Sequence, residues 1–555
     1  MNRNVLVLII IIAAAGGYYF YDRLKATPAP DLAPVGATLL EGLGNYSMPV
    51  TASGPDVQRW FDQSLALTYG FNHDAAERSF LKAAELDPDC AMCWWGAALV
   101  LGPHVNATMD PANNAKAWDR LQRALLAAEE GSEREQAYVR ALSSRYAEAP
   151  PEDRRPLDEA YAQAMAGLAA AYPDDLDVAS LYAESLMDLQ PWDYWDAQGQ
   201  PKGNTAEVVA RLESVIARDP DHAGALHLYI HAVEASDDAA RGAAAADRLR
   251  ELVPGSGHLV HMPAHIYARV GRYHDAVTAN QKAIVADDTY LAICKPGPGV
   301  YPLGYVPHNH HFLWFASTME GNSALALSAA AATAARTSDP QLMRTPGFEA
   351  MQNFALTPLF ADVRFSRWQQ IVDTPQPAAD LPYMVAMWHY AQGMAAVDQG
   401  RLDDARAHHA ELAKGAVDPV IVAMKTWDRY SLADGVRIAE RMLAAQLAQA
   451  AKDVDGAIAA LNEAVAIEDS LLYDEPPAWH SPVRQSLGAV FLAAGRPAEA
   501  QAAYLEELRR NPENGWSLYG LERALRAQGR KDEAKAVAER FASAWAYADI
   551  KLSEL

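Results

Sequence analysis

The sequence predicts an all-α protein built from a long array of paired helices. The turn residues Pro220, Pro254 and Asp288 recur at intervals of 34 residues, and self-similarity at such a period is typical of a two-helix repeat. Small residues recur at fixed offsets from aromatic ones, which lets neighbouring helices approach closely. One pair cannot bury its apolar face, so the pairs are expected to stack, and a chain of 555 residues can grow by such addition.

The chain begins with a segment of a different kind. Val5–Ala15 is an unbroken apolar run, and Gly16–Phe20 extends it to about the minimum length for crossing a bilayer. Its aromatic end is typical of an interfacial belt, whereas Ala13–Ala15 also suits a signal peptidase. We expect residues 1–26 to form a signal anchor or a signal peptide, followed by a linker over residues 27–54.

The repeats then occupy two arrays, expected over residues 55–373 and 383–555. Proline disfavours helix at and before its own position, so the Pro-rich residues 374–382 are the predicted linker between the arrays. The repeat skeleton shows in Trp60, Ala76, Phe80, Ala83 and Pro88, and again in Tyr267, Gly271, Ala276, Asn280 and Ala283.

The clearest copies lie near the C-terminus, where one set of small and aromatic residues recurs after 34 residues. The set comprises Leu487, Gly488, Phe491, Gly495, Ala500, Tyr504 and Pro512, and then Leu521, Leu525, Gly529, Ala534 and Phe541. These segments resemble tetratricopeptide (TPR) repeats. The resemblance implies a TPR-type α-solenoid, a right-handed superhelix whose concave groove is lined by the first helix of each pair and binds a protein or peptide.

Four further segments are similar to a group of bacterial TPR-containing proteins. They are Gly257–Tyr273, which contains the pattern H-M-P-x-H-I, Pro307–Leu313, Cys90–Gly96, which reads C-x-x-C-W-W-G, and Glu475–Trp479. Together with the N-terminal segment, this resemblance implies a protein held in the bacterial inner membrane with its repeats in the periplasm. A cleaved segment would instead release the repeats into the periplasm.

The charge balance limits the kinds of ligand that the chain is expected to bind. The chain has 71 acidic and 47 basic residues, and its net charge is −24. A nucleic-acid ligand is therefore not expected. Membrane contact is expected only through the N-terminal segment.

The histidines give the clearest indication of a binding site, because ten of the sixteen lie between His222 and His311. Histidines four apart share one helical face, and such pairs recur after 34 residues. A shift of 50 residues along the sequence gives a third copy of this histidine pattern, in which only part of it is kept. The predicted metal ligands are His227, His231, His261, His265, His308 and His311. His222, His274 and His310 fall outside this register and are not expected to be ligands.

A cluster of neutral imidazoles favours copper or zinc over calcium or magnesium. Glu234 and Arg269 are the expected groove residues behind the ligands. Two alternatives stay open: a metal-free scaffold whose histidines contact a partner, and a metalloenzyme. No recognised catalytic motif decides whether the protein is an enzyme.

Cys90 and Cys93 form a C-x-x-C pair at the predicted start of a helix. A structural disulfide or plain packing, a redox pair and a contribution to the metal site are all compatible with this spacing. Trp94 follows the second cysteine where a c-type haem site needs histidine, so haem attachment is excluded.

Overall fold

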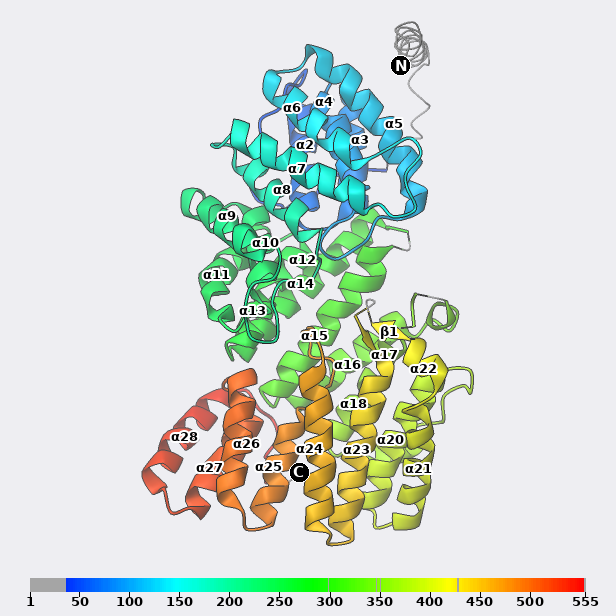
Figure 1. The fold of residues 1–555 in the computed structure, drawn as a ribbon, viewed down its shortest axis with the longest axis vertical. Coiled ribbons are helices and arrows are strands. Elements are labelled where there is room, and N and C mark those ends of the chain that lie inside the picture. The colour runs from blue at the N-terminus through cyan, green and yellow to red at the C-terminus, as the bar shows by residue number, and fades with distance from the viewer. Residues whose placement is uncertain (1–35, 298, 346, 350, 427–428, 554–555) are drawn as a thin grey trace, which may run out of the picture. The chain divides into compact units, whose positions relative to one another are not determined.

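The computed structural model describes residues 36–297, 299–345, 347–349, 351–426 and 429–553. Their regular secondary structure is almost entirely helical, which confirms the predicted all-α class (Figure 1). The chain forms two compact units. Of the described residues, the first unit comprises those in 36–194, 201–228 and 292–296, and the second comprises those in 195–200, 229–291 and 297–553.

Helical hairpins make up the first unit, where each helix packs on its neighbours in sequence. Its helices are α2 (Pro55–Tyr69), α3 (His73–Leu86), α4 (Ala91–Leu99), α5 (Asn114–Ala127), α6 (Glu133–Leu142), α7 (Arg155–Ala171), α8 (Leu176–Met187), α9 (Thr205–Arg218) and the first half of α10 (Ala223–Val233). Short 3-10 turns occur at Pro111–Asn113, Ala128–Glu130 and Ser143–Arg145.

The second unit begins with the helices of the histidine-rich region. These are α11 (Ala243–Leu252), α12 (Gly257–His261), α13 (Pro263–Arg269), α14 (Tyr273–Cys294), α15 (Val306–Met319) and α16 (Ser323–Thr337). Shorter helices follow: α17 (Met351–Ala355), α18 (Thr357–Arg364) and α19 (Trp368–Asp373). Single turns lie at Ala239–Gly242, Tyr301–Tyr305 and Leu342–Arg344.

A regular row of antiparallel helices completes this unit (Figure 1, yellow to red). It comprises α20 (Pro382–Asp398), α21 (Leu402–Gly415), α22 (Pro419–Ala423), α23 (Leu432–Ala450), α24 (Val454–Ser470), α25 (Val483–Ala493), α26 (Pro497–Arg510), α27 (Gly515–Ala527) and α28 (Lys531–Ala544). Strands β1 (Lys425–Thr426) and β2 (Tyr430–Ser431) form one small antiparallel pair. The predicted linker at 374–382 lies inside this unit, between α19 and α20.

Contacts distant in sequence close the second unit on itself. The Trp516 Nε1–H donates to the Thr318 carbonyl at 2.9 Å. The Asp549 carboxylate accepts from the backbone N–H groups of Ser323 (2.7 Å) and Ala324 (2.9 Å) at the start of α16. These bonds hold the C-terminal helices against α15 and α16, so the loop between α24 and α25 can take part in a site with the histidine-bearing helices.

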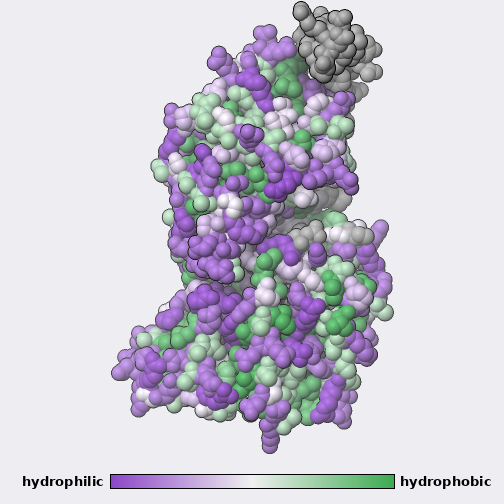
Figure 2. Space-filling view, viewed as in Figure 1, coloured by the Kyte–Doolittle hydropathy of each residue, from purple (hydrophilic) through white to green (hydrophobic). Residues whose placement is uncertain are grey.

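The surface is largely polar on the face shown in Figure 2. On the face shown in Figure 2, hydrophilic residues predominate, and hydrophobic residues form small areas among them. Among the described residues, no helix is both long and apolar enough to cross a bilayer. The predicted anchor at residues 1–26 lies outside the described residues.

Candidate metal centre

Three histidines from three helices meet in the second unit. His261 is the last residue of α12, His265 lies in α13, and His308 lies in the first turn of α15. Pro263 occupies the first position of α13, where its missing N–H costs no hydrogen bond. Met262, between α12 and α13, keeps helical dihedral angles (φ −49°, ψ −37°), and His261 and His265 remain one turn apart.

The ring nitrogens of these histidines face one another. The Nε2 atom of His261 lies 2.7 Å from Nε2 of His265 and 3.1 Å from Nε2 of His308. One nitrogen from each ring lies within 4.8 Å of the other two. His261 and His265 are buried, and His308 is half-buried.

The opposite side of the His261 ring shows which nitrogen carries the proton. Its Nδ1 lies 2.7 Å from Oδ1 of Asn280, whose Nδ2 donates to the Ala276 carbonyl. Since that donation fixes the amide orientation, Nδ1 of His261 is the N–H donor. Its Nε2 therefore presents a lone pair to the other rings.

Glu234 orients a second ring in the same way. Its carboxylate lies 2.5 Å from Nδ1 of His265 and 2.8 Å from Nδ1 of His231. A carboxylate behind an imidazole fixes the tautomer and raises the basicity of the other nitrogen, as in many metal-binding histidines. The Nε2 atoms of His261 and His265 thus lie 2.7 Å apart, close enough to share a hydrogen bond or to bind the same cation.

Burial keeps these imidazoles neutral. It lowers the pKa of His261 to about 4 and lowers the pKa of His265 and His308 well below the ordinary value. Burial also raises the pKa of Glu234, and the nearby charge of Arg269 opposes that effect. Neutral imidazole is the form that binds metal, so the three rings need to lose no proton at neutral pH.

The spacing fits a transition metal after small movements. Zinc–nitrogen bonds of about 2.0–2.1 Å in a tetrahedron place neighbouring nitrogens roughly 3.3 Å apart. The Nε2 atom of His261 lies 2.7 Å from that of His265 and 3.1 Å from that of His308. Shifts of the rings by about half an ångström would therefore give this spacing. Three nitrogen ligands would leave a fourth position for water or substrate.

Not all of the predicted ligands lie in this cluster. His231 lies beside it: it shares Glu234 with His265, and the centres of these two imidazole rings lie 5.9 Å apart. His227 belongs to the first unit, where its Nδ1 lies 2.6 Å from the Tyr69 carbonyl. His311 lies on α15 but packs against the rings of Phe354 (4.6 Å) and Trp314 (5.1 Å).

The remaining predicted site residues divide between the two units. Cys90 and Cys93 form a disulfide in the first unit, so neither sulfur is a thiolate ligand in this structure. Arg269 lies near Glu234 and donates to the Ser236 carbonyl at 3.0 Å. Glu234 and Arg269 thus lie behind the histidines, and the metal itself remains a prediction.

No protein-family model and no curated protein matches the sequence. Among solved structures, the chain is similar to one in the APC/C hetero-tetramer Cut9–Hcn1, with 16% identity and a TM-score of 0.31 over 86% of this chain and 78% of that one. It is also similar to human IFIT1 in a dimer with m7Gppp-AAAA (14% identity, TM-score 0.30, 89% and 91%). The TPR domain of P58(IPK) is a third such chain (11% identity, TM-score 0.21, 86% and 100%).

These similarities extend to the fold class alone. Identities this low and TM-scores this small say nothing about ligands or partners. The assignment of a TPR-type helical repeat therefore rests on the chain's own helix pairs and their spacing in sequence.

The sequence did not identify two residues beside the cluster. Asn280 had been noted only as part of the repeat skeleton, although it lies 2.7 Å from Nδ1 of His261. Glu475, whose Oε1 lies 3.3 Å from Nδ1 of His265, comes from a loop 210 positions later. No local spacing could have placed Glu475 next to α13.

Proposed function

We propose that this TPR-type protein binds one divalent transition-metal ion, copper or zinc, in its second unit. The ligands are His261, His265 and His308. The observation that carries the proposal is the convergence of three ring nitrogens: the Nε2 atom of His261 lies 2.7 Å from that of His265 and 3.1 Å from that of His308. One cation among them would be bound by all three rings.

The surroundings support a metal more than a set of partner-binding histidines. A groove histidine that contacts a peptide needs an accessible ring, but His261 is fully buried and His265 is 2% exposed. The hydrogen bonds from Asn280 and Glu234 hold the rings before any ligand arrives, which limits the entropy lost on metal binding.

Elemental analysis of the tag-free protein tests this proposal. We expect about one equivalent of zinc or copper, and its loss in the double variant His261→Ala, His265→Ala. Circular dichroism of both proteins establishes that the variant keeps its helices.

A matched control addresses adventitious binding. His389 and His408 form another close pair, with their Nδ1 atoms 2.8 Å apart, but both rings are half-buried. The variant His389→Ala, His408→Ala should retain the metal. Equal metal content in all three proteins, or loss only in this control, would refute the proposed site.

The proposed cellular location and the proposed partner rest on the sequence alone. The apolar segment at residues 1–26 supports an inner-membrane anchor with the repeats in the periplasm, and the TPR resemblance supports a protein or peptide partner. Fractionation of cells that make the full chain, or the chain without residues 1–26, tests the anchor. Recovery of both forms in the same soluble fraction would contradict it.

A further inference from the structure

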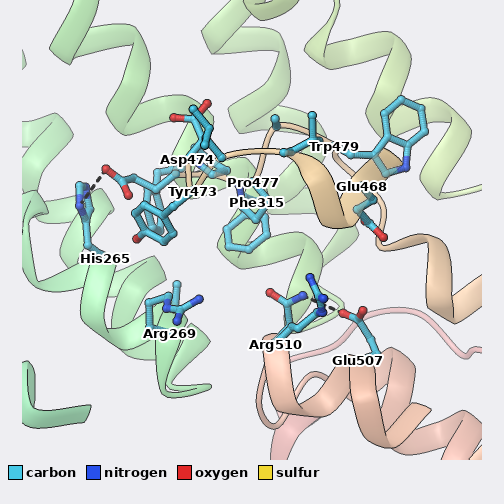
Figure 3. Close-up of a pocket in the computed structure, with 18 residues that line it drawn as sticks. His265, Arg269, Phe315, Glu468, Tyr473, Asp474, Pro477, Trp479, Glu507 and Arg510 are labelled. Carbon is cyan, nitrogen blue, oxygen red and sulfur yellow. Dashed lines mark hydrogen bonds and ion pairs between the residues drawn. The ribbon is translucent and has the colours of Figure 1, made fainter. Parts of the chain in front are cut away.

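A cavity of about 190 Å³ lies beside the metal cluster in the second unit. It is bounded by α13, α15, α26 and the loop that joins α24 to α25 (Figure 3). His265 and Phe312 contribute to its wall, and their rings stack at 5.3 Å. An apolar cavity of about 150 Å³ accommodates benzene, so this one has room for a six-membered ring and a small substituent.

Much of the wall is apolar. Phe312 and Phe315 are buried, and Pro476, Pro477 and Ala268 complete this part of the lining. In Figure 3 the ring of Phe315 lies in the middle of the cavity wall. Such a surface favours the flat or aliphatic body of a small molecule over water.

The carboxylates at the cavity are mostly engaged with the protein. Asp474 accepts from the Tyr430 hydroxyl, Glu507 accepts from Asn511 Nδ2, and Glu468 accepts from the Val483 N–H. Glu475 directs Oε1 to His265 at 3.3 Å and keeps its buried Oε2 without a hydrogen-bond partner. Burial raises the pKa of Glu468 to about 8, so this carboxyl group is mainly uncharged at neutral pH.

Arg269 places a positive charge at the same cavity. Its Nη2 donates to the Ser236 carbonyl at 3.0 Å, its guanidinium lies 5.5 Å from the centre of the Tyr473 ring, and its buried Nε has no hydrogen-bond partner. Arg510, on the other side of the cavity in Figure 3, is paired with Asp469 at 3.0 Å and Glu506 at 3.1 Å. Arg269 is therefore the cation at this cavity whose Nε–H group still lacks a hydrogen-bond acceptor.

We propose that this cavity binds a small organic carboxylate with a single ring or an aliphatic body of similar size. Arg269 holds the carboxylate, Glu475 donates or accepts a hydrogen bond at the same end, and Phe312 and Phe315 contact the body. The site goes beyond the proposed metal binding and does not depend on it.

Calorimetric titration of the full chain with benzoate, benzyl alcohol and benzylamine tests the charge preference. Benzoate should bind, and the neutral and cationic probes should bind at least about tenfold more weakly, because a hydrogen bond to a charged group contributes that much. Arg269→Met should weaken benzoate binding by a similar factor. Arg272→Met is the matched control, because Arg272 pairs with Asp247 and does not line the cavity.

A further variant guards against a fold defect. Arg269→Lys keeps the charge and should bind benzoate with intermediate affinity, and thermal melts of each variant report its stability. The metal content of each protein is measured in parallel, so failure of this site and failure of the metal site give different results. Preference for benzylamine, equal benzoate binding in Arg269→Met, or no benzoate binding by the unaltered protein would overturn the proposal.

Discussion

At the scale of single residues, Glu234 has the largest expected effect on the metal centre without being a ligand. Its two oxygens face Nδ1 of His231 and Nδ1 of His265, and its side chain is 1% exposed. An amide at this position would replace one of these two oxygens by an NH₂ group, which cannot accept a hydrogen bond from the ring that it faces. The ring of His265 would then lose the partner that fixes its tautomer.

We therefore expect Glu234→Gln to lower metal affinity about 10- to 100-fold. Competition with a chromophoric chelator measures the change. Glu320→Gln provides the control, because Glu320 is also buried and lies 3.1 Å from Nδ1 of His274, a histidine outside the cluster. Equal losses in both variants would mean that the effect comes from general destabilisation.

His311 tests the choice of ligands in another way, because it is a buried histidine of α15 that lies outside the proposed metal site. Burial lowers its pKa to about 3, whereas an unfolded histidine titrates near 6.5. Below pH 6.5 the unfolded state binds a proton that the folded state does not, so the free energy of unfolding falls as the pH falls from 6.5 towards 3.

We expect His311→Phe to remove this contribution and to keep the metal. In metal-free protein, the loss of stability between pH 7 and pH 5 should be smaller by about 2 kcal/mol than in the unaltered chain. Urea unfolding at both pH values measures it. An unchanged pH dependence, or a loss of metal, would show that His311 has another role.

At the scale of helices, glycines set how closely neighbouring repeats approach. Tyr504 of α26 lies between Gly488 of α25 and Gly520 of α27. A Cβ atom at Gly488 would lie 2.5 Å from Cζ of Tyr504, and one at Gly520 would lie closer still. The same tyrosine ring thus requires a glycine on each adjacent helix.

Gly520→Ala should lower the free energy of unfolding by about 1–3 kcal/mol, because the aromatic ring must move to admit the methyl group. Gly435→Ala in α23 is the control. The nearest atom to its added Cβ is Tyr383 Oη at 3.9 Å, so this variant should be as stable as the unaltered chain or slightly more so. A Gly520→Ala protein with unchanged stability would contradict the close packing around Tyr504.

At the scale of the whole molecule, the proposed metal site belongs to one unit only. The three ligands lie in α12, α13 and α15, all within the second unit. A ligand that binds the native state stabilises it by about 2.7 kcal/mol at one hundred times its dissociation constant. That stabilisation should appear first in the elements that carry the ligands.

Hydrogen exchange with and without zinc measures this distribution. Amide protection should increase in α12, α13, α15 and the adjacent part of α14, while α2 to α8 of the first unit serve as the internal reference. Equal increases across both units would indicate that the metal acts elsewhere or on the whole chain.

The helical class and the register of the repeats follow from the amino-acid sequence alone. The period of 34 residues and the paired small and aromatic residues are local properties, and each repeat packs mainly on its neighbours. The same register predicted that His261 and His265 share one turn, because that spacing depends only on helical geometry.

Only the tertiary structure decided which histidines meet and what surrounds them. His308 joins His261 and His265 because α15 packs against α12, whereas His311, one turn further along α15, faces Phe354 and Trp314. Glu475 reaches His265 from 210 positions away because the second unit closes on itself. Such approaches depend on the rotation of each helix and on the path of the chain between helices, which local periodicity does not specify.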